Sequence, residues 1–446
     1  MNPKGNKKKD FAKRQNHRHS PLQKEIWEGT IERLAWGGLG VSHLEDGRIL
    51  LLESPLALFP QEVVRASIRH KSKHAEGEVI SWVSPSPQRS SSKCAVAGIC
   101  GGCSLQGAGE WHSDLKRSMV TDLFRRMLPN CGWSWMPAPP EALRQRIQLH
   151  WDGTSLGFHQ RKKNIVVPIS YCPTAVSAIS ESIPRLKEAL EHNVLPPRPQ
   201  RWELATGTPA TEVFAIDEKQ RIWGLEPDGW HRTEKPVVHN FYEPDSSFQR
   251  LRNHVIEHKP GGFFQVSAEW AMKVFYDVLT QWDVHGDTLY DLYGGVGLFS
   301  SIIGEKFYKC VLVESDSDST LYAGRNFGWI CANKHDCYEL VQLDPSVGCV
   351  RLKCISSTVE DWMPNYLGNQ NDVILLDPPR AGLTPEIINK LNNSKAGTLV
   401  LIGCDGATFC RDIKLLSQVW TINDIAVVDL FPMTAHVECI GLLQRP

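Results

Sequence analysis

The stretch "DVILLDPPRAGL" (Asp372–Leu383) indicates a buried strand that ends at a carboxylate. Four apolar residues precede Asp377, and Pro378 and Pro379 follow it. Proline cannot donate to a sheet and favours extended backbone in the residue before it, so the strand is expected to stop here. In a parallel sheet the Asp377 carboxylate would project at the carboxyl edge, where such sheets bind ligands. A plain turn is the competing interpretation.

Around this stretch, strand-like and helix-like segments alternate after Pro260, which predicts a doubly wound α/β sheet over residues 261–446. The expected strands are Leu289–Tyr293, Cys310–Glu314, Val350–Ser356, Val373–Asp377, Thr398–Ile402 and Cys439–Leu443. The carboxyl ends of parallel strands share one edge, so residues that follow these strands are candidates for a common site.

A glycine-rich turn follows the first of these strands in "DLYGGVGLFS" (Asp291–Ser300). Gly294, Gly295 and Gly297 allow a sharp turn into a helix and a close approach to a ligand. Glu314 ends the next strand 23 positions after Asp291, near the offset of about 20 at which a carboxylate receives ribose hydroxyls. The full G-x-G-x-x-G pattern of dinucleotide sites is absent, which favours the nucleoside of S-adenosylmethionine.

Two cysteines lie in "LVLIGCDGATFCRD" (Leu399–Asp412), where an apolar run ends and a helix is expected from Thr408. The strand-to-helix corner places Cys404 at the carboxyl edge of the sheet, whereas Cys410 lies a turn or more down the helix. Either could instead be a buried cysteine that only packs, because cysteine often behaves as a small hydrophobe.

The chain of 446 residues holds 13 cysteines, with neither a signal peptide nor an apolar run long enough to span a bilayer, so we expect a cytoplasmic protein. Disulfides are rare there, which favours metal binding or catalysis. Cys94, Cys100 and Cys103 form C-x5-C-x2-C, and Cys172 follows downstream. Four thiolates can hold an iron–sulfur cluster or a zinc ion, and the spacing does not separate the two. Buried structural cysteines are the alternative.

The N-terminal third predicts a basic tail followed by a small barrel. Residues 1–20 carry seven lysines and arginines against one acid, Asp10, although the net charge of the whole chain is only −1. We expect this tail to be disordered and either to contact RNA phosphates or to aid solubility. Residues 21–84 contain short strand-like runs broken by glycine turns, which is typical of a small barrel.

Residues 85–260 form the expected central domain, which contains the four cysteines. Leu115, Met119, Leu123 and Met127 recur at helical spacing and predict an amphipathic helix. A basic region follows, which suits an RNA backbone or a solvated surface equally: Arg144, Arg146, His159, Arg161, Lys162 and Lys163.

With "DPPRAGL" (377–383), Cys404, Thr408 and "DLFPMTAHVE" (429–438), the chain resembles the RNA uracil-5-methyltransferase family from about residue 24 to the end. Residues 21–84 resemble its TRAM domain, an OB-like RNA-binding barrel. The resemblance implies a Rossmann-like methyltransferase domain and formation of 5-methyluridine in RNA. Cluster cysteines and a TRAM domain favour the branch that acts on 23S rRNA over the tRNA branch.

The resemblance also implies roles for individual residues. It makes Cys404 the nucleophile and Glu438 the base. It assigns S-adenosylmethionine contacts to Gln265, Tyr293, Glu314 and Asp377, and the ligands of a [4Fe–4S] cluster to Cys94, Cys100, Cys103 and Cys172.

The implied chemistry explains these residue types. The Cys404 thiolate adds to C6 of uracil, which makes C5 nucleophilic enough to attack the donor's methyl group. Glu438 then removes the C5 proton so that the cysteine can leave. The target base must leave its stack, and Phe263 and Phe264 are candidates to stack on it.

The chain departs from the family pattern around the nucleophile. Asp405 and Gly406 stand where Asn-Pro is usual, and Leu401 and Gly403 replace the usual tyrosine and serine. A polar residue is also usual at the position of Met433. The negative charge of Asp405 is expected to raise the pKa of the neighbouring thiol, which would alter rate or substrate choice.

Three other functions stay open. The chain could be a non-catalytic RNA-binding or assembly protein with this fold, a tRNA uridine methyltransferase, or an RNA cytosine-5 methyltransferase. In each case we expect RNA as the partner, no membrane contact and a monomer.

Overall fold

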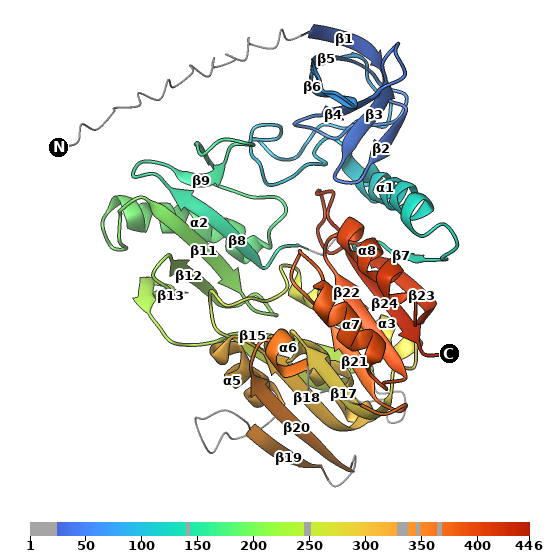
Figure 1. Ribbon diagram of the computed structural model, residues 1–446. Coiled ribbons are helices and arrows are strands. Elements are labelled where there is room, and N and C mark those ends of the chain that lie inside the picture. Colours follow the sequence, from blue (N-terminus) through green and yellow to red (C-terminus); the bar gives the residue numbers. More distant parts are fainter. Residues whose placement is uncertain (1–24, 140–142, 245–250, 328–337, 345–347, 364–367) are drawn as a thin grey trace, which may run out of the picture.

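The computed structural model describes residues 25–139, 143–244, 251–327, 338–344, 348–363 and 368–446. Three sheets with their own cores follow one another along the chain, and a two-stranded ribbon joins the second to the third (Figure 1). The basic tail predicted for residues 1–20 lies outside the described residues. The α/β multidomain class is as predicted.

The first sheet has six strands in the order β1-β5-β6-β4-β3-β2. Its buried side chains alternate with more exposed ones, as Val64, Ala66 and Ile68 of β5 do. This is the period-two pattern of a sheet with one buried face. The strands are β1 (Glu25–Thr30), β2 (Arg33–Ala35), β3 (Leu39–His43), β4 (Ile49–Glu53), β5 (Val63–His70) and β6 (His74–Ser84). Their identity as a TRAM domain stays a prediction.

The second sheet is antiparallel, in the order β10-β9-β8-β11-β12-β13-β14. Helix α2 (Ser177–Glu191) buries Ile179, Ile183 and Leu186 in a core shared with Trp202. The strands are β8 (Arg146–Trp151), β9 (Leu156–His159), β10 (Val166–Pro168), β11 (Gln200–Thr206), β12 (Val213–Asp217), β13 (Ile222–Glu226) and β14 (Gly229–Arg232), and the ribbon is β15 (Val237–Pro244) with β16 (Leu251–His258).

The third sheet has nine strands in the order β19-β20-β18-β17-β21-β22-β24-β23-β7. Strands β20, β18, β17, β21 and β22 are parallel, and β24 runs antiparallel to β22. The strands are β7 (Ser134–Met136), β17 (Gly286–Leu292), β18 (Phe307–Glu314), β19 (Tyr338–Asp344), β20 (Gly348–Ser356), β21 (Val373–Leu376), β22 (Thr398–Gly403), β23 (Thr421–Val428) and β24 (Glu438–Gln444). All six expected strands are present, and β7, β19 and β23 are additions.

Helices cover both faces of the third sheet, which explains why β21 is apolar throughout. Val373 and Leu375 pack on one face, and Ile374 and Leu376 pack on the other. Helices α3 (Ala268–Gln281), α4 (Leu298–Ile303) and α5 (Ser317–Asn326) cover the first face, with the short η2 (Gly304–Lys306) after α4. Helices α1 (His112–Met127), α6 (Val359–Trp362), α7 (Pro385–Asn393) and α8 (Gly406–Leu416) cover the second.

Helix α1 joins the first sheet to the third, as the ribbon diagram shows (Figure 1). After η1 (Gly109–Trp111), its residues Leu115 and Met119 enter the core of the first sheet. Val120 and Phe124 enter the core of the third. The predicted amphipathic helix is therefore correct, but it has two apolar faces. Within the part of the chain described here, no helix is both long and apolar enough to cross a membrane.

Candidate active site

The candidate site lies where the strand order reverses in the third sheet. The chain runs from β17 outward to β18 and β20, and then returns to β21 on the other side of β17. Leu292 pairs with Leu376 at the carboxyl ends of β17 and β21, and the Asp377 amide donates to the Leu292 carbonyl oxygen at 3.3 Å. Open α/β sheets bind ligands at such a switch point. Asp377 thus follows the strand directly, as predicted.

The turn after β17 requires its glycines. A Cβ at Gly294 would lie 2.6 Å from Leu312 Cγ, so only glycine fits there. Gly295 and Gly297 have φ of 53° and 79°, in the left-handed region that glycine enters without steric cost. Tyr293 also has a positive φ, 59°. The turn therefore brings backbone close to the end of β18.

Two carboxylates hold this turn in place. Asp291 Oδ2 accepts from the Ser300 amide at 3.0 Å and from its hydroxyl at 2.6 Å, which ties α4 to β17. Glu314 Oε2 accepts from the Gly295 amide at 3.0 Å. The Tyr293 hydroxyl donates to Glu360 Oε1 at 3.0 Å. Tyr293 and Glu314 therefore lie at the same edge as Asp377.

Cys404 and Glu438 lie at this edge, at the ends of two neighbouring strands. Strand β22 ends at Gly403, which pairs with Cys439 near the start of β24. Cys404 and Glu438 flank that last pair, one after β22 and the other at the first position of β24. Cys404 is half-buried, and Glu438 is 3% exposed. Cys410 is fully buried in α8 and packs there, as expected for the second cysteine.

Burial and neighbouring acids keep this thiol protonated in the free protein. The pKa of Cys404 is raised to about 11, first by burial and then by Glu438 and Asp377, while Arg380 acts in the opposite direction. Burial, with a contribution from Asp291, raises the pKa of Asp377 to about 7. Burial and Asp377 raise the pKa of Glu438 well above its usual value. A dry carboxyl next to a thiol is suited to proton transfer near neutral pH.

Asp405 is not among the main causes of the raised pKa of Cys404, contrary to the expectation from the sequence. Its Oδ1 accepts from the Thr408 amide at 2.8 Å and caps α8, which begins at Gly406 rather than at Thr408. Its Oδ2 accepts from Trp36 Nε1 at 3.3 Å. Burial raises the pKa of Asp405, but these hydrogen bonds outweigh it and leave the pKa below its usual value. Glu438 and Asp377 are the acids that chiefly raise the thiol pKa, so the expected cause is wrong.

The loop before α3 holds the remaining predicted residues. Gln265 is half-buried there, and no hydrogen bond or ion pair among the described residues joins it to the other predicted contacts. Phe264 is 4% exposed and stacks on His239 and His258, with ring centroids 4.8 and 4.9 Å away. It cannot also stack on a flipped base, so that expectation is wrong. Phe263, 70% exposed, remains available.

The four predicted cluster cysteines line one cavity. Cys94, Cys100, Cys103 and Cys172 all contribute to it, and none forms a disulfide. The Gly102 amide points at Cys100 Sγ, 3.4 Å away. Burial raises the pKa of the Cys100 and Cys103 thiols. Four free thiols on one cavity, with an amide aimed at a sulfur, fit a group held by four thiolates.

Part of the predicted basic region is neutralised within the protein. Arg146 Nη2 lies 2.8 Å from Glu203 Oε2. Arg161 and Lys162 both pair with Glu53. These side chains therefore offer less positive charge to an RNA than the sequence indicates.

Lys116 is a structural residue that the sequence pattern missed. Its ammonium is fully buried and donates to Asp429, to the Phe431 carbonyl oxygen at 2.7 Å and to the His436 carbonyl oxygen at 2.9 Å. Burial lowers the pKa of Lys116 to about 8, although Asp429 opposes the shift. It thereby holds the loop that leads into Glu438. Helical spacing assigned this position to the solvent side, so no signal identified it.

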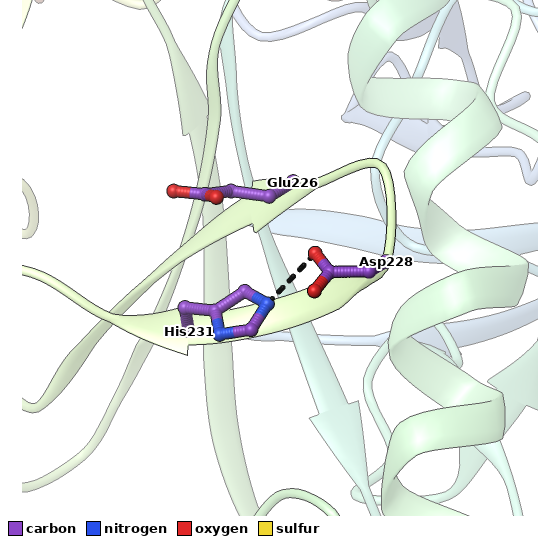
Figure 2. Close-up of side chains that lie close together, drawn as sticks. All are labelled: Glu226, Asp228 and His231. Carbon is purple, nitrogen blue, oxygen red and sulfur yellow. Dashed lines mark hydrogen bonds and ion pairs between the residues drawn. The ribbon is translucent and has the colours of Figure 1, made fainter.

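Figure 2 shows a second set of ligand-type side chains, at the turn between β13 and β14. Glu226, Asp228 and His231 place one ligand atom each within 4.8 Å of one another, and all three are exposed. His231 Nε2 and Asp228 Oδ1 are joined by a hydrogen bond of 2.9 Å. Such exposed groups are common without an ion, and we assign them no function.

Comparison with known proteins supports the same family. Residues 248–446 match the model of the family described as tRNA (uracil-5-)-methyltransferase. Similarity to RNA methyltransferases extends over more than nine tenths of the chain. The chain is thus similar to RNA uracil-5-methyltransferases.

Relatives from distant organisms cover nearly its full length. An uncharacterized RNA methyltransferase of Thermotoga maritima is 27% identical, over 93% of this chain and 98% of the relative. The 23S rRNA (uracil(1939)-C(5))-methyltransferase of Methylococcus capsulatus is 26% identical, over 96% of this chain and 99% of the relative. The solved tRNA (uracil-54, C5)-methyltransferase of Pyrococcus abyssi, in complex with S-adenosyl-L-homocysteine, superposes with a TM-score of 0.65 at 22% identity. It covers 94% of this chain and 100% of its own, and shows the fold.

Proposed function

We propose that this protein transfers a methyl group from S-adenosylmethionine to C5 of a uridine in RNA, through a covalent bond between Cys404 and C6. The observation that carries the proposal is the pairing of Gly403 with Cys439. It sets a half-buried thiol and a buried carboxyl side by side at the edge where parallel sheets bind ligands.

Each residue has a defined part in the reaction. Cys404 Sγ bonds to C6, and the electrons of the C5–C6 double bond move onto the O4 carbonyl. C5 attacks the methyl carbon of S-adenosylmethionine, whose bond from sulfur to that carbon breaks, and S-adenosylhomocysteine is the leaving group. Glu438 takes the C5 proton, the double bond reforms, and the thiolate leaves. Before the first step Cys404 must lose its proton, and the charge of Arg380 favours the thiolate.

Asp377, Glu314, Tyr293 and Gln265 are the proposed donor contacts. Three of them support this role by their place at the switch point of the sheet, where Glu314 accepts a hydrogen bond from the glycine turn and Asp377 directly follows β21. Gln265 rests on the family resemblance alone. A carboxylate next to a glycine-rich turn suits ribose hydroxyls.

Cys94, Cys100, Cys103 and Cys172 would hold a [4Fe–4S] cluster. The four cysteines are far in sequence from the strands that carry Cys404 and Glu438. The cluster would therefore stabilise the central domain and take no part in methyl transfer. Zinc is the alternative for four thiolates. Metal analysis of the purified protein tests this assignment. Iron together with a broad visible absorbance would support the cluster, and a colourless protein with one zinc ion per chain would contradict it.

Ribosomal RNA is the substrate class we propose first. Full-length relatives are named for uridine 1939 of 23S rRNA and for uridine 54 of tRNA. The four cavity-lining cysteines favour the rRNA branch. Nucleoside mass spectrometry of rRNA and tRNA, with and without this gene, separates the possibilities.

Loss of one 5-methyluridine from 23S rRNA is the expected result. Loss of 5-methyluridine from tRNA would identify tRNA as the substrate instead of rRNA. Loss of 5-methylcytidine would show that the enzyme methylates cytosine and not uracil. An unchanged inventory of methylated nucleosides would contradict enzymatic activity and favour an RNA-binding or assembly role.

A further inference from the structure

A tryptophan of the first sheet touches the loop that carries Cys404. Trp36 lies in the turn between β2 and β3, which the Gly38 amide closes by donating to the Ala35 carbonyl oxygen at 3.1 Å. Gly37 and Gly38 have φ of 85° and 82°, so the turn depends on both glycines. This sharp turn directs the half-buried indole away from its own sheet and against the second face of the third sheet.

The indole makes two contacts with the residues that follow the cysteine. Its Nε1 donates to Asp405 Oδ2, and its six-membered ring covers Gly406. A Cβ at Gly406 would lie 2.7 Å from Trp36 Cη2, closer than atoms of these types approach. Asp405 and Gly406 are the two positions at which this chain departs from the family's Asn-Pro, and Trp36 accounts for both.

The same turn also rests on the loop that leads to Glu438. A Cβ at Gly38 would come within 3.5 Å of Ala435 Cβ, and Ala435 is buried in the core of the first sheet. The Ala435 amide donates to Ser104 Oγ at 2.9 Å. The β2–β3 turn thus contacts the loop that carries Cys404 and lies next to the loop that leads to Glu438.

We infer that Trp36 is a positioning residue, which fixes the Cys404 loop through Asp405 and thereby couples the first sheet to the chemical step. The inference rests on the proposed function of Cys404. Asp405 is bonded from both sides, by the Thr408 amide and by Trp36 Nε1, so its carboxylate and the cysteine before it keep one orientation. Reactions that need a near-attack geometry lose rate steeply when a nucleophile is misplaced.

Trp36→Phe tests the hydrogen bond while keeping an aromatic ring. We expect single-turnover methyl transfer at saturating RNA to slow roughly tenfold or more, because an ångström of misplacement can cost about a hundredfold. The dissociation constant for RNA should not change. Trp27→Phe, in β1 of the same sheet, is the matched control and should react at the wild-type rate.

A second readout does not depend on methyl transfer. Burial is the largest cause of the raised pKa of Cys404, so a loosened loop should expose the thiol. We expect iodoacetamide to alkylate Cys404 of Trp36→Phe several-fold faster than the wild-type residue, measured by peptide mass spectrometry. Faster alkylation together with slower methylation distinguishes positioning from a general loss of folded protein.

The glycine gives a compensatory test. Gly406→Ala should slow methyl transfer in the wild-type background, because the new Cβ displaces the indole. In a Trp36→Ala background the same change should cost nothing further. Gly132→Ala, where a Cβ meets nothing within 4 Å, is the control.

Two results would overturn the inference. One is a Trp36→Phe enzyme with the wild-type single-turnover rate and weaker RNA binding, which would make Trp36 an RNA contact. The other is strictly additive effects of Trp36→Ala and Gly406→Ala. Failure of the proposed function is separate, since the wild-type protein would then transfer no methyl group.

Discussion

At the scale of single residues, burial favours the thiol form of Cys404, the proposed nucleophile. A thiol with a pKa of about 11 is almost wholly protonated at pH 7. Glu438 and Asp377 both raise that pKa, and removing a nearby negative charge must lower it. Arg380 is the cation that acts in the opposite direction and favours the thiolate.

The first prediction concerns Glu438→Gln. In the wild-type protein, alkylation of Cys404 by iodoacetamide should rise about tenfold per pH unit from pH 7 to 10, because the thiolate fraction does. Glu438→Gln should lower the Cys404 pKa and accelerate alkylation at pH 8, while abolishing turnover. Peptide mass spectrometry measures the rate, and exposed Glu386→Gln is the control. Unchanged or slower alkylation of Glu438→Gln would contradict the assigned cause of the shift.

At the scale of elements, α1 holds the loop Asp429–Glu438 through one buried lysine. The side chains of Lys116 and Asp429 are both fully buried and form an ion pair, so removing the lysine leaves the carboxylate without its ammonium partner. Removing one partner of a buried pair leaves an uncompensated charge, which costs about 3 to 5 kcal/mol.

The second prediction is that Lys116→Met lowers the free energy of unfolding by about 3 to 5 kcal/mol at pH 7. Urea titration monitored by circular dichroism measures it. Lys187→Met, which breaks the exposed Lys187–Glu191 pair on α2, should change it by less than about 0.5 kcal/mol. Asp429→Asn added to Lys116→Met should recover part of the loss. Equal effects of the two lysine variants would show that the buried pair contributes little.

The elements also show what sequence could and could not predict. The strands ending at Leu292, Leu376 and Gly403 were predictable because apolar runs stop at glycine, proline or aspartate. The burial of Lys116 was not, because helical periodicity identifies one apolar face and α1 packs against two sheets. Strand β7 was missed because three residues carry no periodicity, and it joins the third sheet from within the predicted central domain.

The candidate site was predictable to the extent that each residue follows or begins a strand. Asp377 and Cys404 lie at one edge because parallel strands share their carboxyl ends. Glu438 lies there because β24 runs antiparallel to β22 and begins at that edge. Trp36 was not predictable, since only the packing of the first sheet on the third brings it to Asp405. The orientation of the Asp405 carboxylate was not predictable either, because it is determined by the hydrogen bonds from the Thr408 amide and the Trp36 indole.

At the scale of the whole molecule, three separate parts meet at the loop before Glu438. Lys116 of α1 binds it from one side. The Leu105 amide donates to the Met433 carbonyl oxygen at 2.9 Å, directly after the cysteine loop that contains Cys103. The β2–β3 turn contacts Ala435. A short stretch of backbone therefore connects the cysteine cavity to the loop before the proposed base.

The third prediction follows from that connection. Cys100→Ser should lose the iron and visible absorbance of the proposed cluster, and should slow methyl transfer although residue 100 lies outside the proposed catalytic edge. Cys131→Ser, a half-buried cysteine outside the cavity, should keep both. Iron analysis and single-turnover assays measure the two effects. Full activity of iron-free Cys100→Ser would show that the cavity and the catalytic edge are independent.

The proposed mechanism requires a covalent bond between Cys404 and C6 of a uridine in RNA. The most direct measurement is peptide mass spectrometry of the protein after incubation with S-adenosylmethionine and RNA carrying 5-fluorouridine, whose C5 has no proton for Glu438 to remove. We predict one nucleotide adduct, on the peptide that contains Cys404, and none on Cys404→Ala. An adduct on Cys410 or another residue, or methylation at C5 by Cys404→Ala, would contradict the mechanism.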